Sequence, residues 1–151
     1  MKELIDSHVF SENSIELLPA YFSLAEANIG IGGHRLKKAE EFLIAAYWNL
    51  LKFTSDKDEK GGQGDSGAED SLVDDQDIET YRSKLHKTFG RLFMSKNEES
   101  ALKKAKEEFS LGIYKECIEH GPESIQLCSS YFYMGQIFMQ DGSIIKARAY
   151  F

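Results

Sequence analysis

Apolar residues recur at steps of three and four along most of this chain, the spacing that places side chains on one face of an α-helix. Residues 131–151, YFYMGQIFMQDGSIIKARAYF, show the pattern most clearly. Their first stripe consists of Tyr131, Met134, Gly135 and Phe138. Gly142 interrupts this stripe, because glycine readily takes the positive φ angle found after a helix end. A second stripe begins with Ile144, Ala147 and Phe151, so the segment predicts two helices joined by a tight turn.

The same periodicity predicts earlier helices over residues 15–30, 35–53, 77–95 and 101–120, and places the helix of the first stripe at 124–140. Pro19 falls in the first turns of the 15–30 helix, where a missing N–H costs little. Pro122 follows Gly121 and ends the 101–120 helix, because proline cannot continue one. In the 35–53 helix we expect Tyr47 and Trp48 to belong to the packed face. The prediction is an all-α protein.

Residues 54–76 differ from the rest of the chain in having almost no large apolar side chains. Residues 54–80 contain ten Asp or Glu residues and only two lysines, which gives a local net charge of −8, whereas the whole chain has a net charge of −7. A segment with so little apolar surface cannot offset the entropy lost on ordering. We therefore expect 54–76 to be a disordered acidic insert within a single domain that spans residues 1–151.

Composition restricts the classes of function. No apolar run reaches the eighteen or more residues of a membrane span, and the chain outside residues 54–80 carries a net charge of only +1. Nucleic-acid binding requires a strong basic patch, so we expect neither nucleic acid nor membrane as a partner. Cys117 and His120 lack a second ligand pair for zinc. We expect no metal, no cofactor and no catalytic residue, and interpret the chain as a non-enzyme.

Two segments of the chain repeat each other without a gap. Residues 11–32, SENSIELLPAYFSLAEANIGIG, align with residues 121–142, GPESIQLCSSYFYMGQIFMQDG. Identical residues stand at six positions, namely Ser14/Ser124, Ile15/Ile125, Leu17/Leu127, Tyr21/Tyr131, Phe22/Phe132 and Gly32/Gly142. Repetition at this scale indicates stacked units, each of which needs a neighbour to cover its apolar face.

The spacing of large and small residues within each unit resembles the tetratricopeptide repeat, a helix–turn–helix of 34 residues. The resemblance implies three units, at about 15–53, 77–120 and 122–151 with the last incomplete, stacked as a right-handed superhelix. Asn28 departs from the pattern, which has an aromatic residue there. The residues expected to define the packing are Tyr21, Leu24, Ala25, Ala39, Leu43, Phe89, Gly90, Phe93, Ala105, Phe109, Tyr131, Met134, Gly135, Phe138 and Ala147.

Longer stretches are similar to the repeat region of the zinc finger MYND domain-containing protein 12 family. They are SIELLPAYFSLAEANIGIG, KKAEEFLIAAYWNLLK, LHKTFGRLFMSK and SSYFYMGQIF, in this order. The resemblance implies a ciliary or flagellar axonemal protein that associates with an inner-arm dynein heavy chain and another tetratricopeptide-repeat subunit. Two cysteines cannot supply the ligands of a MYND finger. We therefore expect a finger-less relative or a fragment, without a zinc site.

An alternative interpretation is a generic cytosolic adaptor that binds a peptide in the concave groove of the repeats. Chaperone-binding tetratricopeptide domains hold a terminal carboxylate there with Lys and Asn. This chain lacks that clamp, because the matching positions carry Phe22, Glu26, Thr88, Ser129 and Tyr133. A basic stripe could contact an acidic partner, although a solvated helix face is the favoured interpretation. The stripe consists of Arg82, Lys84, Lys87 and Arg91.

The end of the third unit is a predicted partner surface. Its second helix reaches Phe151 before the small residue that follows one turn later in a full repeat. Solenoids usually end in a polar cap, whereas apolar side chains stand at this end. The residues of this predicted surface are Ala149, Tyr150 and Phe151.

Overall fold

The computed structural model of the chain describes residues 15–60 and 75–151, and all regular structure in these ranges is helical. The all-α prediction is therefore confirmed for this part of the chain. The helices are η1 (Ile15–Leu17), α2 (Leu18–Ile31), η2 (Gly33–Arg35), α3 (Leu36–Lys60), α4 (Asp75–Lys96), α5 (Glu99–His120), η3 (Ile125–Leu127), α6 (Cys128–Gln140) and α7 (Ile144–Tyr150).

The predicted helix ends agree with the structure within a few residues, except at the end of α3. This helix continues to Lys60, and α4 begins at Asp75, so residues 54–60 and 75–76 of the predicted disordered insert are helical. The hydroxyl groups of Thr54 and Ser55 donate hydrogen bonds to the Leu51 carbonyl at 2.8 and 3.1 Å, so these polar side chains are compatible with the helix. Lys and Glu are also good helix formers without any packing partner. The prediction of disorder for 61–74 lies outside the described residues.

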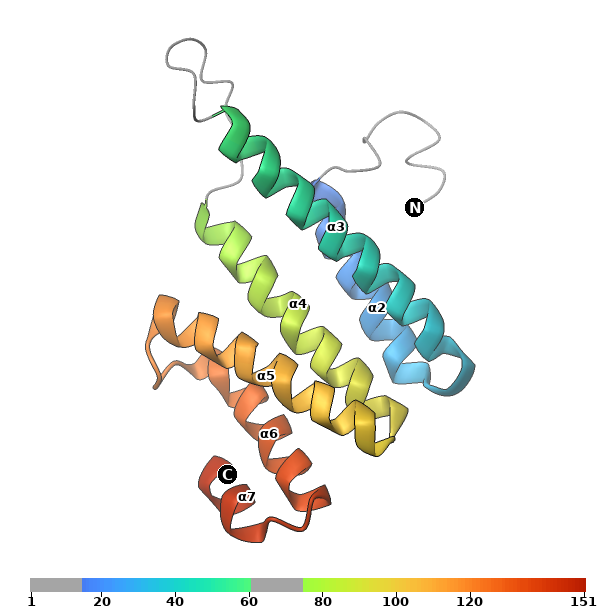
Figure 1. Cartoon of the computed structure of the whole chain (residues 1–151), viewed down its shortest axis with the longest axis vertical. Helices are drawn as coiled ribbons and strands as arrows, with labels where there is room; N and C mark the ends of the chain where they lie inside the picture. The colour runs from blue at the N-terminus through green and yellow to red at the C-terminus, as the bar shows by residue number, and fades with distance from the viewer. Residues whose placement is uncertain (1–14, 61–74) are drawn as a thin grey trace.

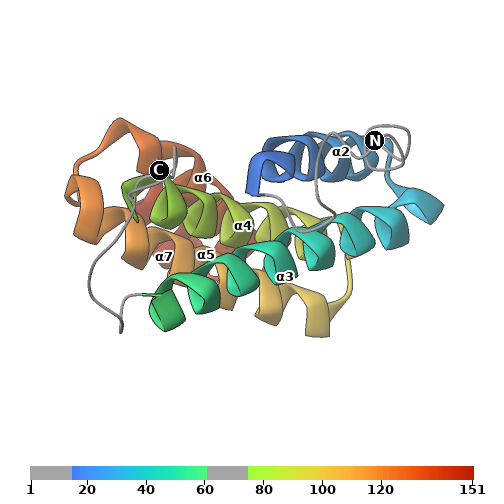
Figure 2. The same cartoon turned by 90° about the horizontal axis from the view of Figure 1, so that it is seen from above.

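The helices pack as successive antiparallel pairs, α2 with α3, α4 with α5, and α6 with α7 (Figure 1). The first helices of the pairs, α2, α4 and α6, run in the same direction and contact one another in turn. Figure 2 shows these helices toward one side of the molecule and α3, α5 and α7 toward the other. Each pair packs on the next mainly through its second helix, because α3 contacts α4 and α5 contacts α6 more extensively than the first helices contact one another, and such stacking is that of a helical repeat.

The core consists of two clusters that follow this arrangement. The larger one joins α2, α3 and α4, and includes the fully buried Phe22, Leu43 and Leu92. The smaller one joins α5 and α6 around Phe109 and Ile137. Of the predicted packing residues, Tyr21, Ala25, Ala39, Leu43, Gly90, Ala105, Phe109, Met134, Gly135 and Ala147 are buried, while Leu24, Phe89, Phe93, Tyr131 and Phe138 are half-buried.

The prediction for Tyr47 and Trp48 was wrong, because both side chains are exposed. Helix α3 carries two apolar stripes with the same spacing. The buried stripe contains Ala39, Leu43, Ala46 and Leu50. The exposed stripe contains Ile44, Tyr47, Trp48 and Leu51, and within it the Tyr47 and Trp48 rings meet edge to face at 5.9 Å between centroids.

Two glycines mark the same close approach in successive pairs. A Cβ atom added to Gly90 of α4 would lie 2.7 Å from the Phe109 ring of α5, and one added to Gly135 of α6 would lie 2.7 Å from the Phe151 ring. Aromatic rings thus pack directly on helix backbone at equivalent positions. The aligned turn glycines Gly32 and Gly142 also share a positive φ, of 72° and 70°. The repetition seen in the sequence is therefore present in the packing.

We predict opposite consequences for alanine at these two glycines. Phe109 is fully buried and has no room to shift, so Gly90→Ala is expected to lower the free energy of unfolding by about 1–2 kcal/mol through overpacking. The Phe151 ring is 65% exposed and can move outward, so Gly135→Ala should be neutral or gain up to about 1 kcal/mol from helix propensity. Urea denaturation of both variants measures the difference, and equal destabilisation would contradict the assigned packing.

Candidate interaction groove

A groove of about 440 Å³ lies where α2, α4 and α6 run side by side. Its position follows from the pairing of the helices, because the first helix of every pair contributes one face to it. Helix α4 forms the largest share, and η3 and one residue of α5 complete it. The lining residues are Glu26, Thr80, Lys84, Lys87, Thr88, Arg91, Glu116, Gln126, Ser129 and Tyr133.

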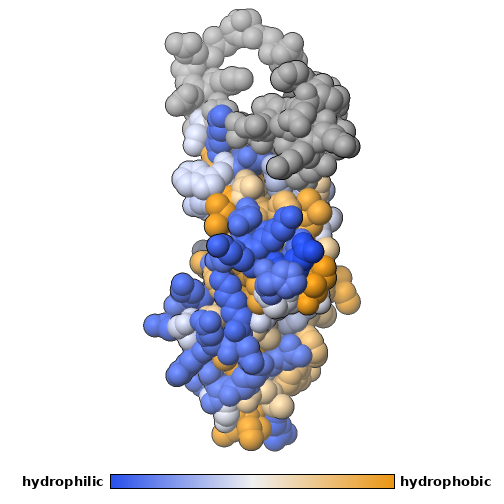
Figure 3. All heavy atoms as spheres, turned by 90° about the vertical axis from the view of Figure 1, so that its right-hand side faces the viewer, coloured by the Kyte–Doolittle hydropathy of each residue, from blue (hydrophilic) through white to orange (hydrophobic). Residues whose placement is uncertain are grey.

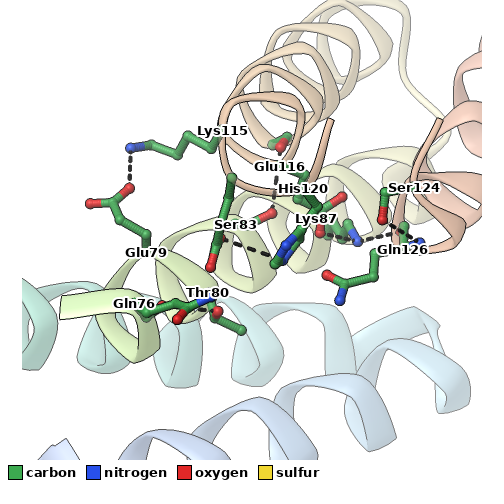
Figure 4. Close-up of polar contacts among 12 residues, drawn as sticks. Gln76, Glu79, Thr80, Ser83, Lys87, Lys115, Glu116, His120, Ser124 and Gln126 are labelled. Carbon is green, nitrogen blue, oxygen red and sulfur yellow. Dashed lines mark hydrogen bonds and ion pairs between the residues drawn. The ribbon is translucent and has the colours of Figure 1, made fainter. Parts of the chain in front are cut away.

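Lys87 is the central polar contact of the groove (Figure 4). Its ammonium group pairs with the carboxylate of Glu116 on α5, and it donates a hydrogen bond to the Gln126 carbonyl of η3 at 3.0 Å. Glu116 is buried, and its second carboxylate oxygen has no partner among the described residues. A buried carboxylate needs a charged or hydrogen-bonding partner, so Lys87 compensates Glu116 and also connects the second pair to the third.

The other basic residues of the predicted stripe have different partners. Arg91 lies 3.5 Å from the Glu26 carboxylate and stacks its guanidinium over the Tyr133 ring at 5.9 Å. Arg82 pairs with Glu79 at 2.8 Å, outside the groove. Lys84 has no carboxylate within 4 Å in the described part of the chain, and its ammonium lies 5.3 Å from the Phe22 ring centroid. Most of the stripe is thus neutralised within the molecule, which favours a solvated and internally paired helix face.

The positions matched to the carboxylate clamp do meet in one place. Glu26, Thr88, Ser129 and Tyr133 all line the groove, whereas Phe22 is fully buried beneath it. Only neutral or acidic side chains stand at these positions, so the positive charge of the groove comes from Lys84, Lys87 and Arg91. Two of these three cations already face carboxylates. The groove therefore has little excess charge with which to hold a terminal carboxylate.

The predicted surface at the end of α7 is only partly available. Ala149 and Phe151 are exposed. Tyr150, in contrast, is half-buried, because its ring stacks on Phe138 at 5.3 Å and contacts Tyr131 at 6.1 Å. Tyr150 is the next residue after exposed Ala149 on α7, so its side chain points in a different direction, toward α6. It packs within the third unit, and its assignment to the partner surface is corrected.

The described residues offer little reactive chemistry. They contain no group of three or more His, Cys, Asp or Glu side chains that could hold a metal ion. The Sγ atom of Cys117 lies 3.9 Å from the Tyr131 hydroxyl. Partial burial and this contact raise the pKa of Tyr131 above its ordinary value. No helix in the described ranges is long and apolar enough to cross a membrane.

The chain matches no known protein-family model.

Proposed function

We propose that the chain is a non-catalytic protein-interaction scaffold built from tetratricopeptide-type repeats. The observation that carries the proposal is the ring-on-glycine contact repeated within two successive helix pairs, Phe109 on Gly90 and Phe151 on Gly135. Stacked pairs of this kind present extended surfaces, and such surfaces bind other proteins. Right-handed coiling of the stack belongs to the same proposal.

The more specific proposal is an axonemal subunit that associates with an inner-arm dynein heavy chain and a second tetratricopeptide-repeat protein in cilia or flagella. Its support is the similarity of four sequence stretches to a ciliary family. Three of these stretches cover α2, most of α3 and the second half of α4, and the fourth lies in α6. The resemblance therefore extends over parts of all three helix pairs, not over one isolated unit.

Affinity purification of the tagged chain from ciliated cells tests this proposal. We expect an inner-arm dynein heavy chain and a second repeat protein to co-purify from axonemes after salt extraction. A tagged variant with Ala105→Glu, which disrupts the second pair, serves as a misfolded control and should lose both proteins. Recovery of the wild-type chain only with soluble cytosolic proteins would contradict the axonemal assignment.

A second candidate function is supported by the groove. A volume of about 440 Å³ lined by Thr88, Ser129 and Tyr133 could hold an extended peptide segment, as a generic cytosolic adaptor requires. In that case substitution of Tyr133 should abolish partner recovery. For the axonemal scaffold we expect Tyr133→Ala to retain the dynein heavy chain, because assembly then uses surfaces outside the groove.

A further inference from the structure

The aligned segments of α2 and α6 have the same sequence pattern but a very different burial. Phe22 is 0% exposed, whereas its equivalent Phe132 is 49% exposed. Ile29 is 7% exposed, whereas its equivalent Met139 is 58% exposed. Ile15 and Ile125 differ in the same way, with Ile15 buried and Ile125 exposed. Three apolar residues spaced by seven positions thus form a covered stripe along the first helix of the first pair, and an open one along the first helix of the third pair.

The structure shows what covers the first stripe. Helix α4 runs alongside α2 in the same direction (Figure 1). The Tyr81 ring stacks on Phe22 with 6.2 Å between centroids, and the Lys84 ammonium lies over the same ring at 5.3 Å. Part of the cover on Ile15 comes from α3, which contacts η1, whereas α7 makes no such contact with η3 in the described part of the chain. Phe132 and Met139 are the positions that a parallel helix would cover.

We propose that Ile125, Phe132 and Met139 form a docking stripe for a helix of a second protein, which runs parallel to α6 and carries an aromatic residue and a lysine one turn apart. This inference rests on the proposed scaffold function and names the surface that it uses. The stripe occupies the positions of η3 and α6 that correspond to the covered stripe of η1 and α2. Apolar side chains are visible at the end of the molecule where α6 and α7 lie (Figure 3).

The chemistry of the partner helix follows from the contact that α4 makes. A flat aromatic face on Phe132 buries apolar area, and a cation over the exposed ring gains a cation–π interaction. Gln136 occupies the position equivalent to Glu26. The Glu26–Arg91 pair therefore has no charged counterpart on α6, and no arginine is required of the partner. The recognition signal is an apolar helix face with Tyr and Lys three residues apart.

A fluorescent synthetic peptide of residues 75–96, the α4 sequence, serves as the probe, because it carries Tyr81 and Lys84 in the required spacing. Fluorescence anisotropy with the full chain is expected to show binding. Phe132→Glu and Met139→Glu should each weaken it about tenfold or more. Trp48→Glu replaces a similarly exposed apolar residue on α3 and should leave binding unchanged. Circular dichroism verifies that all three variants remain folded.

A peptide with Tyr81→Ala and Lys84→Ala is expected to bind about tenfold more weakly to the wild-type chain. Absence of peptide binding, or equal binding by wild type and Phe132→Glu, overturns the proposal. Equal binding would mean that the peptide replaces α4 on α2. A dimer that Phe132→Glu dissociates, without peptide binding, would show that a second copy covers the stripe, and also overturns it. If the peptide experiment overturns this inference while the dynein heavy chain still co-purifies, the proposed function stands.

Discussion

Replacing Ala105 with glutamate is expected to unfold the α4–α5 pair and to lower the free energy of unfolding by about 3–5 kcal/mol. Ala105 is completely buried in the cluster that joins α5 to α6, beside Phe109. Apolar side chains surround Ala105 in this cluster, so the new carboxylate would be crowded and would lose its hydration. Urea denaturation followed by circular dichroism at 222 nm measures the loss.

The matched control is Ala149→Glu. Ala149 is exposed on α7, so the same change should alter stability by less than about 0.5 kcal/mol. A melting temperature of Ala105→Glu that equals that of the wild type would refute the placement of Ala105 between the helices.

Replacing Lys87 with methionine is the second large effect that we expect, at about 2–3 kcal/mol. Methionine fills a similar volume but removes the charge that compensates buried Glu116 and the hydrogen bond to the Gln126 carbonyl. The ion pair lies within the second pair, and the hydrogen bond joins the second pair to η3 of the third. Thermal unfolding should therefore show a lower melting temperature and earlier loss of the α6–α7 pair.

Two variants identify the cause of that effect. Lys84→Met removes a lysine from the same groove that has no carboxylate partner in the described ranges, so it should cost well below 1 kcal/mol. The double variant Lys87→Met, Glu116→Gln should recover part of the loss, because the uncompensated charge is then absent. If the loss of unfolding free energy in the double variant equals the sum of the losses in Lys87→Met and Glu116→Gln, the Lys87–Glu116 pair does not have the role assigned to it.

The helix pairs could be predicted from the sequence because their periodicity and small-residue positions agree. Gly90 and Gly135 stand where a ring packs on the backbone, and Gly32 and Gly142 stand in turns that need a positive φ. In both cases a steric requirement selects the residue type. Such requirements fix a small residue at a set position of a unit, and therefore they are visible in one sequence.

Other features depend on contacts that periodicity does not contain. In α3, two apolar stripes have equal spacing, so the pattern could not tell that Ala46 faces the core and Trp48 faces solvent. Continuation of α3 to Lys60 was missed because charged helix formers carry no apolar signal. The sequence predicted an exposed Tyr150. Its ring contacts Phe138 and Tyr131 on another helix, and periodicity within one helix does not show such contacts.

The groove was only partly predictable. Its neutral positions, such as Thr88 and Tyr133, were placed by the match to the repeat, but the Lys87–Glu116 pair was not foreseen. A signal for it existed, since Glu116 continues the buried stripe of Ala105, Phe109 and Gly112 at steps of four and three. A carboxylate on the buried face of a helix requires a partner. The identity of that partner depends on how α4 lies against α5.

Cross-linking mass spectrometry of isolated cilia tests the central claim most directly. Lys146 is the only lysine from residue 121 onward, and it is exposed on α7, in the third pair. Lys37, Lys38 and Lys52 are exposed on α3, in the first pair, and provide the comparison. A scaffold that docks a partner through its third pair predicts cross-links from Lys146 to a lysine of a second axonemal protein. Cross-links to other proteins from α3 alone, with none from Lys146, would contradict it.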